Sequence, residues 1–458
     1  MSQRLSNSDF RKPKPDKARL LAYDLISQVN QDGAYANIRL PDLLKVSQLE
    51  QRDKALATEL SYGTLRMQGR YDYFIAQKID RSIAELDPKI LNLLRMGMHQ
   101  IDYMRTPDHA AVSATVEVAR FVAGESKASY VNAILRAITR DTNYSSAIAA
   151  DSALSATERL SIEYSHPEWI VKAFYDQLKD WDKVEELLRI DNLPVAPHLV
   201  AWPGKSTVEN LLETGGRELP LSSYAIESDH LPSEYPEIES RRAGVQDLGS
   251  QIVAETFYNT AKLSLDSAIS WLDMCAGPGG KAALLYNLVE TSRPQDIFTA
   301  NEPTAHRAEL VARVVPSSLI TQNDGRDWAA FGATYDRILV DAPCTGLGAL
   351  RRRPEARWRR TPNDLKNLVA LQRQLLDSAY ELLNPGGVIG YATCSPHIAE
   401  TMGQILDFTH RHKDMKILSV ADFVKSPTGG ENPDGTLQLW SHIQHSDSMY
   451  LALLQKPL

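Results

Sequence analysis

Three cysteines are the side chains of this 458-residue chain best suited to covalent chemistry. They are Cys275 in LDMCAGPGGK, Cys344 in LVDAPCTGLG and Cys394 in YATCSPHIAE. Each follows an apolar, strand-like run and precedes a loop that contains glycine or proline. A cysteine taken singly is more often a small buried hydrophobic residue than a nucleophile. Two of them at neighbouring strand ends, beside a cofactor crevice, favour a thiolate nucleophile.

The first cysteine opens a loop suited to a nucleoside-bearing cofactor. The glycines of CAGPGGK let the backbone approach a ligand, and the helix expected from Lys281 presents unpaired N–H groups. Glu302 ends the next strand about twenty residues later, where a ribose-binding carboxylate belongs. Asp324 follows a third strand over the same crevice. An isolated glycine-rich loop is often only a tight turn, but the two carboxylates favour a cofactor site.

A carboxylate beside the second cysteine completes a recognisable chemistry. Asp341 closes the fourth strand, where it can accept a hydrogen bond from an amino group or a protonated ring nitrogen. A thiolate and a nucleoside cofactor together suit methylation at C5 of a pyrimidine. The thiolate adds to C6, C5 becomes nucleophilic and takes the methyl group, and the carboxylate stabilises the developing charge. These residues do not choose between Cys344 and Cys394 as the nucleophile.

Arginines follow the second cysteine closely in LRRRPEARWRR. A charge run is usually a solvated face, but arginines with an interleaved aromatic also suit phosphates and stacked bases. Its place beside a candidate catalytic loop favours RNA contact. The residues concerned are Arg351, Arg352, Arg353, Arg357, Arg359 and Arg360, with Trp358 among them.

Composition narrows the class of protein. The chain is 43% hydrophobic with a formal net charge of −8, and its first 145 residues are mildly basic while the rest is acidic. No apolar run approaches the ~20 residues of a membrane span, and the N-terminus lacks the apolar core of a signal peptide. The sequence contains no CxxC pair, so we expect neither a disulfide framework nor a cysteine-based zinc site, and we expect no other metal. Three thiols suit a cytoplasmic protein, which we expect to be a monomer.

Hydrophobic periodicity predicts a multidomain chain. Residues 1–16 form a flexible basic tail, and residues 17–145 an all-α domain with apolar positions at helical spacing. Residues 146–244 hold a polar linker and a small α+β connector domain. Residues 245–458 alternate strands with helices, which predicts a doubly wound parallel sheet. Ligands of such sheets bind at the carboxyl ends of the strands, where all three cysteines are expected.

Prolines within the all-α domain are expected at helix boundaries. Pro41, Pro88 and Pro107 lie between the helical runs.

These motifs resemble the RNA cytosine-C5 methyltransferase family. LDMCAGPGGK, DRILVDAPCTGLGALRRRPEARW and YATCSPHIAET are similar to its cofactor loop, proline-cysteine motif and threonine-cysteine motif. GVQDLGSQIVAE resembles the segment before its catalytic domain, and residues 17–140 resemble a NusB-type helical RNA-binding domain. The resemblance implies a Rossmann-like class I methyltransferase domain that acts on small-subunit (16S) rRNA with S-adenosylmethionine.

The resemblance also implies residue roles. Glu302 holds the cofactor's ribose, Asp324 lies near its adenine, and Asp341 lies near its sulfonium and the target cytosine. Cys394 is the nucleophile, and Cys344 assists breakdown of the covalent intermediate. The cofactor loop comprises Cys275, Ala276, Gly277, Pro278, Gly279, Gly280 and Lys281.

Some positions depart from the family pattern and some alternatives stay open. PHIAET stands where PEEN is typical, Glu302 where Asp is common, and CAGPGG where CAAPGG is usual. The same chemistry could act on tRNA or another RNA. A non-catalytic RNA-binding assembly factor and a small-molecule methyltransferase are further alternatives. The target nucleotide, and whether free rRNA or an assembling subunit is the substrate, stay open.

Overall fold

The computed structural model describes residues 13–104, 106–141, 144, 148, 151–264 and 267–458. Most of the predicted tail over residues 1–16, and much of the predicted linker after residue 141, lie outside the described residues. The chain divides into two compact units. One contains Met1–Val171 with Arg352–Trp358, and the other contains Lys172–Arg351 with Arg359–Leu458. The domain boundaries at residues 16, 145 and 244 stay predictions.

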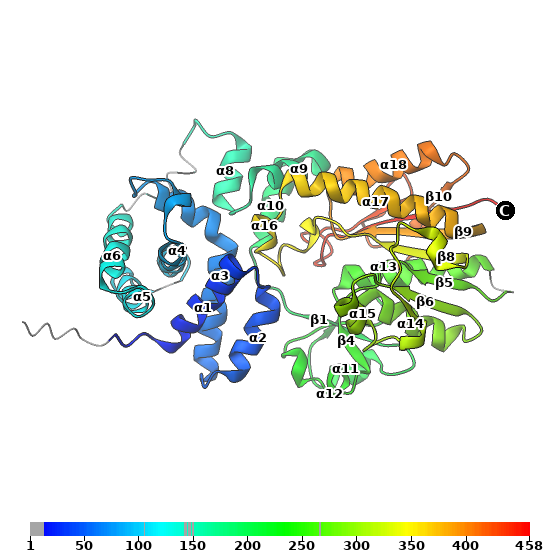
Figure 1. The fold of residues 1–458 in the computed structure, drawn as a ribbon, viewed down its shortest axis with the longest axis horizontal. Helices are drawn as coiled ribbons and strands as arrows, with labels where there is room; N and C mark the ends of the chain where they lie inside the picture. The colour runs from blue at the N-terminus through cyan, green and yellow to red at the C-terminus, as the bar shows by residue number, and fades with distance from the viewer. Residues whose placement is uncertain (1–12, 105, 142–143, 145–147, 149–150, 265–266) are drawn as a thin grey trace, which may run out of the picture. The chain divides into compact units, whose positions relative to one another are not determined.

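The N-terminal part of the first unit is all helical, as the periodicity predicts (Figure 1). Its main helices are α1 (Lys17–Asp32), α2 (Ala36–Val46), α3 (Gln51–Ala76), α4 (Pro88–Asp102), α5 (Asp108–Ala123), α6 (Glu125–Thr139) and α8 (Ala156–Glu163). Local capping explains two of the starts. The Asp16 carboxylate accepts from the N–H of Arg19 before α1, and Asp87 caps α4, whose first residue is Pro88.

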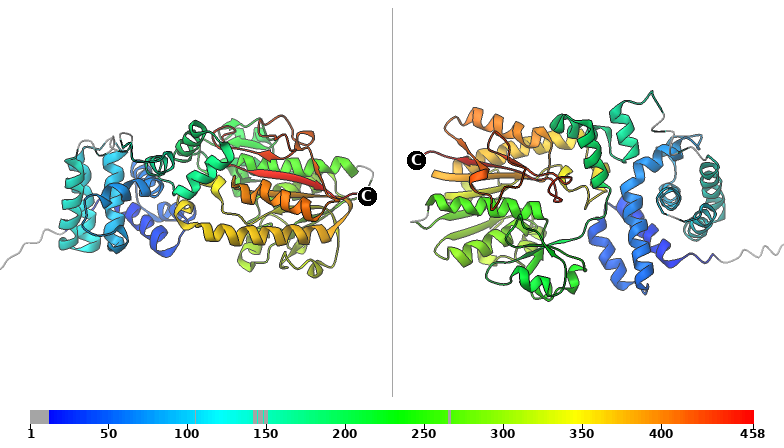
Figure 2. Two further views of the ribbon diagram at one scale, coloured as in Figure 1. Left: turned by 90° about the horizontal axis from the view of Figure 1, so that it is seen from above. Right: turned by 180° about the vertical axis from the view of Figure 1, so that it is seen from behind.

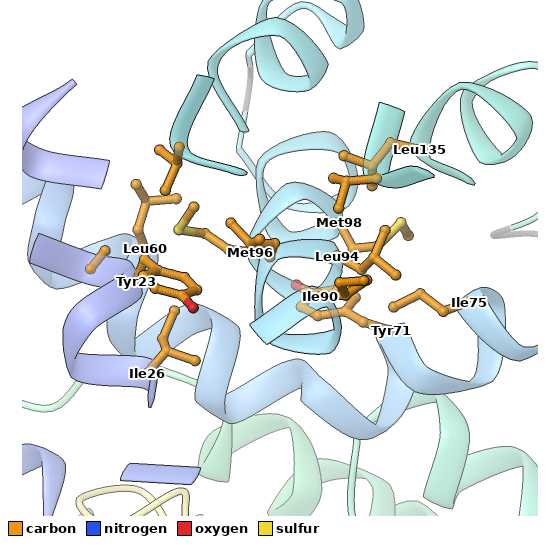
Figure 3. Packing of buried hydrophobic residues seen from close by; sticks show 14 of the residues in the cluster. Tyr23, Ile26, Leu60, Tyr71, Ile75, Ile90, Leu94, Met96, Met98 and Leu135 are labelled. Atoms are coloured by element: carbon orange, nitrogen blue, oxygen red, sulfur yellow. The ribbon is translucent and has the colours of Figure 1, made fainter. Parts of the chain in front are cut away.

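Apolar residues at helical spacing form one core in this unit. Figure 3 shows Leu60, Tyr71 and Ile75 of α3 facing side chains of α4. Residues of α1 and α6 complete the same cluster. Each helix buries its row of apolar side chains against neighbouring helices, so the helices are stabilised mainly by packing.

One proline expectation is wrong. Pro88 and Pro107 lie at helix starts as expected, but Pro41 lies inside α2. Proline lacks the N–H that would bond to the carbonyl of Asn37. Both residues are exposed, so water can hydrogen-bond to this carbonyl and the short helix persists.

The second unit contains a small antiparallel sheet. Its strands β2, β3, β1 and β4 are hydrogen-bonded in that order, and they agree with the predicted α+β character of the connector. The bounds are β1 (His198–Ala201), β2 (Arg217–Glu218), β3 (Ala225–Glu227) and β4 (Ala243–Val245). Two helices precede β1 in the sequence, α9 (Glu168–Leu178) and α10 (Trp181–Asp191), and a short helix, α11 (Val208–Leu212), connects β1 to β2.

A larger, mostly parallel sheet forms the rest of the second unit. The strand order is β10-β12-β9-β8-β5-β6-β7, with β11 paired to β12. Strands β5 to β9 are parallel, whereas β12 runs antiparallel to β9 and β10. The bounds are β5 (Ser270–Asp273), β6 (Ile297–Asn301), β7 (Ile320–Thr321), β8 (Tyr335–Asp341), β9 (Leu383–Thr393), β10 (Lys416–Leu418), β11 (Leu437–Gln438) and β12 (Tyr450–Gln455). This confirms the predicted doubly wound α/β class.

Helices cover both faces of this sheet (Figures 1 and 2). Trp271 and Leu339 point to the face of α13 (Leu248–Tyr258) and α14 (Gly280–Ser292). Their chain neighbours Leu272 and Ile338 point to the face of α17 (Pro362–Leu382) and α18 (Met402–Arg411). Because side chains alternate along a strand, these strands are buried on both sides. The scaffold beneath the strand ends is therefore rigid.

Candidate active site

The chemically reactive residues gather at one edge of the large sheet. Strand β5 ends at Asp273, β8 at Asp341 and β9 at Thr393. Their carboxyl ends are adjacent because β5 pairs with β8 and β8 with β9. The strand order reverses between β5 and β8, which is where doubly wound sheets bind ligands. The predicted cluster of strand-end residues is present.

Two of the three cysteines are in direct contact. The Sγ atoms of Cys344 and Cys394 lie 3.3 Å apart, close enough for one thiol to donate a hydrogen bond to the other. The N–H of Gly348 donates to the carbonyl of Cys394 at 2.9 Å, which ties the two loops together. Contact with Cys394, followed by burial, raises the pKa of the Cys344 thiol well above its ordinary value. Both effects favour the protonated form of the Cys344 thiol.

The third cysteine has a different environment. Cys275 packs against the apolar cluster on the α17 side of the sheet. Burial, reinforced by the charge of Asp273, raises the pKa of its thiol well above the ordinary value. A raised pKa favours the protonated thiol, which is a poor nucleophile compared with the thiolate.

A buried cation lies beside the carboxylate of the fourth strand. Lys281, in the first turn of α14, places Nζ 2.9 Å from Oδ2 of Asp341. Burial lowers the pKa of Lys281, but the charge and hydrogen bond of Asp341 outweigh it and the pKa is raised. The charge of Cys394 contributes in the same direction. The Lys281 cation thus acts electrostatically on both Asp341 and Cys394.

The glycine loop closes onto the predicted ribose carboxylate. Glu302 is buried, accepts from the N–H of Thr304 at 2.9 Å, and lies 3.1 Å from Nη1 of Arg307. Arg307 also donates to the carbonyl of Gly277. A side chain at Gly277 would overlap the Glu302 carboxylate, so only glycine allows this approach. Gly279 has a φ of +117° at the start of α14, a conformation that glycine tolerates.

Asp324 occupies a more open position. Its carboxylate is about half exposed and pairs with Arg326, whose Nη2 lies 2.5 Å from Oδ2. Hydrogen bonds from Arg326 lower the pKa of Asp324 to about 2. Within the described residues, the hydrogen bonds and the ion pair of the Asp324 side chain are made with Arg326 and not with residues that bond to Glu302 or Asp341.

Asp273, the last residue of β5, was not among the predicted site residues. Its side chain is fully buried and has no side-chain hydrogen-bond partner among the described residues, while the backbone N–H of Cys275 acts on its carboxylate and lowers its pKa. Burial, followed by the charge of Asp341, raises its pKa to about 7. An acidic residue directly before CAGPGG was the available signal. Because Asp273 is closed off from solvent beneath the loop, it can act on a bound ligand only through its charge.

The raised pKa of Asp273 has a measurable consequence for stability. The folded protein holds a proton that the unfolded chain releases, so stability is lost as pH rises from about 4 to about 7. The slope should reach about 1.4 kcal/mol per pH unit. We expect Asp273→Asn to flatten this dependence in chemical denaturation between about pH 4 and about pH 7. Asp296→Asn is the control, because Asp296 is buried at the other end of the sheet and hydrogen-bonded to Arg293 and Trp271. Equal slopes for Asp273→Asn and the unmodified protein would contradict the assignment.

Two arginines of the predicted RNA-contact stretch are structural. Arg357 is fully buried in the first unit, where Nη1 donates to the carbonyls of Arg66 and Ser165 at 3.1 and 3.2 Å. Arg351 is buried in the second unit and donates to the carbonyl of His445 at 3.0 Å. Each guanidinium is buried and bonded to backbone carbonyls through one Nη atom, so the interpretation as RNA contacts is wrong for both. Arg353 is exposed.

The described residues provide neither a metal site nor a membrane-spanning helix. No group of three or more histidine, cysteine, aspartate or glutamate side chains there could hold a metal ion. None of the described helices combines the length and apolar character needed to cross a membrane.

Comparisons with known proteins match both ends of the chain. The family model described as 16S rRNA methyltransferase RsmB/F matches residues 261–455, and the model of the NusB family matches residues 16–140. "Putative methyltransferase Rv1407" of Mycobacterium tuberculosis is 41% identical, with 96% of this chain and 97% of that protein covered. The ribosomal RNA small subunit methyltransferase B of Xanthomonas campestris pv. campestris is 32% identical, with 96% and 97% covered.

Solved structures share the fold. The crystal structure of PH0851 has a TM-score of 0.78 at 20% identity and covers 97% of this chain and 100% of that chain. A methyltransferase homolog protein from Pyrococcus horikoshii has a TM-score of 0.52 at 18% identity, with 66% and 100% covered.

Proposed function

Since this chain belongs to the 16S rRNA methyltransferase RsmB/F family and is therefore a methyltransferase, we propose that it methylates C5 of cytosine in small-subunit rRNA. The proposed methyl donor is S-adenosylmethionine, and the proposed nucleophile is Cys394. The observation that carries the proposal is the contact between Cys344 and Cys394 beside the Lys281–Asp341 ion pair. A methyltransferase acting on a more nucleophilic atom needs no such pair of thiols.

The residues present fit S-adenosylmethionine. The glycine loop brings its backbone so close to the Glu302 carboxylate that a side chain at Gly277 would overlap it, and the Asp341 carboxylate lies at a neighbouring strand end. Residues 275–281 would hold the cofactor together with Glu302, Asp324 and Asp341. When bound, the cofactor supplies an electrophilic methyl group.

Electrostatics support Cys394 as the nucleophile. The raised pKa of Cys344 keeps that thiol protonated, while the Lys281 cation favours the thiolate of Cys394. As the Cys394 thiolate adds to C6, N3 of cytosine takes up a proton from water, so the ring becomes a neutral enamine with its nucleophilic carbon at C5. Asp341 accepts a hydrogen bond from N3–H or from the N4 amino group. After C5 takes the methyl group, a base removes the C5 proton and the ring expels Cys394 as thiolate. The Cys344 S–H, which can donate to that leaving sulfur, assists this release.

The substrate class rests on the helical domain and on the relatives. The NusB family match over residues 16–140 supports an RNA substrate, and the Xanthomonas campestris relative is named a ribosomal RNA small subunit methyltransferase. A cytoplasmic location agrees with that substrate. This location, the monomeric state and the absence of a metal cofactor stay predictions.

The direct test is methyl transfer to unmodified RNA. We expect labelled methyl groups from S-adenosylmethionine to enter small-subunit rRNA as 5-methylcytosine, identified by nucleoside mass spectrometry. Free rRNA and assembling subunits are tested in parallel, with tRNA as the competing substrate. Methylation confined to tRNA, or methylation at an atom other than C5, would overturn the proposal.

A further inference from the structure

A buried carboxylate lies behind the two contacting thiols. Glu400 ends the short helical turn Ile398–Glu400 and is fully buried. Its carboxylate accepts from the N–H of Thr345 at 2.8 Å, from the Thr345 hydroxyl, and from Nε2 of Gln372 at 3.1 Å. Three donors stabilise it as an acceptor in a site without solvent.

The same network holds the residue on each side of Cys344. Thr345 follows Cys344 and is bonded to Glu400 through both backbone and side chain. Pro343 precedes Cys344, and its carbonyl accepts from Nε2 of Gln372 at 2.9 Å. The Cys344 loop is thus fixed at both flanks by one carboxylate and one amide.

The network also reaches the loop of Cys394. The hydroxyls of Thr345 and Ser395, the residue after Cys394, lie 3.2 Å apart. The Tyr391 hydroxyl donates to the carbonyl of Glu400 at 2.8 Å, which fixes the turn against β9. Because the loops of both thiols end in one buried cluster, their separation is set by the protein and not by the substrate.

Charge gives the cluster a second effect. Cys394, burial and then the negative charge of Glu400 all raise the pKa of Cys344. Tyr391 is the further titratable group that interacts with Cys344. Glu400 therefore favours the protonated form at Cys344.

We propose that Glu400, supported by Gln372, is a positioning residue that fixes the Cys344 loop against Cys394. The inference rests on the proposed function. It assigns the unequal roles of the two thiols to a side chain that touches neither substrate nor cofactor.

Glu400→Gln tests the proposal because glutamine keeps the shape of the side chain but removes its negative charge. Its NH2 group would also face the donors of Thr345 and Gln372, which now bond to the carboxylate. We expect kcat on RNA to fall about ten- to hundred-fold with little change in KM. Alkylation of Cys344 by iodoacetamide, followed by peptide mass spectrometry across pH, should reach its midpoint at lower pH. Thr345→Val removes one donor only, and we expect a smaller fall in kcat, about three- to ten-fold.

Glu255→Gln is the matched control. Glu255 is also buried and accepts from a backbone N–H, that of Ser223 at 3.0 Å, and from the Ser222 hydroxyl. Its replacement should alter stability but neither kcat nor the Cys344 alkylation profile. An unchanged alkylation profile in Glu400→Gln, or an equal loss of kcat in Glu255→Gln, would overturn the proposal. Thiol alkylation needs no RNA, so the test remains decisive even if the unmodified protein fails to methylate rRNA.

Discussion

Replacing Cys394 with alanine should reduce methyl transfer by at least about ten-thousand-fold while cofactor binding persists. Cytosine C5 is too weak a nucleophile until a thiolate has added to C6. Cys394 is the thiol of the contacting pair that interacts with the Lys281 cation, whereas contact with Cys394 and burial raise the pKa of Cys344. The measurement is single-turnover methyl transfer with labelled S-adenosylmethionine, alongside calorimetric binding of the same cofactor.

The neighbouring thiol provides the comparison for this variant. Cys344→Ala removes the partner 3.3 Å away and leaves the proposed nucleophile in place. It should still consume one equivalent of methyl donor while turnover stops, since release of the product needs Cys344. Equal single-turnover activity of Cys394→Ala and the unmodified protein would contradict the assignment of the nucleophile.

Asp341→Asn should lower kcat by about a hundred- to a thousand-fold. The substitution removes the acceptor for the N3/N4 edge of cytosine and leaves the buried Lys281 without its partner at 2.9 Å. The hydrogen bond from the cytosine to Asp341 stabilises the reacting complex, so the rate of methyl transfer in a single turnover should fall as well. A control for a buried acidic residue is Asp296→Asn, which breaks the Arg293–Asp296 pair just before β6.

The two variants should separate activity from stability. Asp296→Asn is expected to lower the melting temperature and retain kcat, because the amino ends of the strands lie opposite the site. Asp341→Asn is expected to lose stability as well, because Lys281 stays buried without its partner, but its loss of kcat should persist at temperatures where the variant is fully folded. A similar loss of kcat in both variants would show that Asp341 acts only through the fold.

Strand–helix alternation was enough to predict the part of the site that backbone geometry sets. Once the sheet is parallel and doubly wound, Asp273, Asp341 and Thr393 must end at one edge. The residues that follow them, including both contacting cysteines, are then brought together. For the same reason the glycine loop and Glu302 could be paired in advance.

Features set by tertiary packing could not be predicted in this way. Arg357 belongs to a charged run, but its partners Arg66 and Ser165 are far away in the sequence, so its burial has no local signal. The bonds from Gln372 and Thr345 to Glu400 likewise join three separate segments. Pro41 lies inside a helix because exposure of its turn removes the usual penalty, which depends on the folded surface.

The measurement that tests the central claim most directly is the capture of the covalent intermediate. Cys344→Ala protein is incubated with S-adenosylmethionine and unmodified small-subunit rRNA, then denatured and separated by size. We predict a protein–RNA adduct that survives denaturation, with the link mapped to Cys394, and no adduct in the Cys344→Ala, Cys394→Ala double variant. If the cofactor binds but the single variant forms no adduct with any RNA, or if the double variant forms the same adduct, methylation through Cys394 is contradicted.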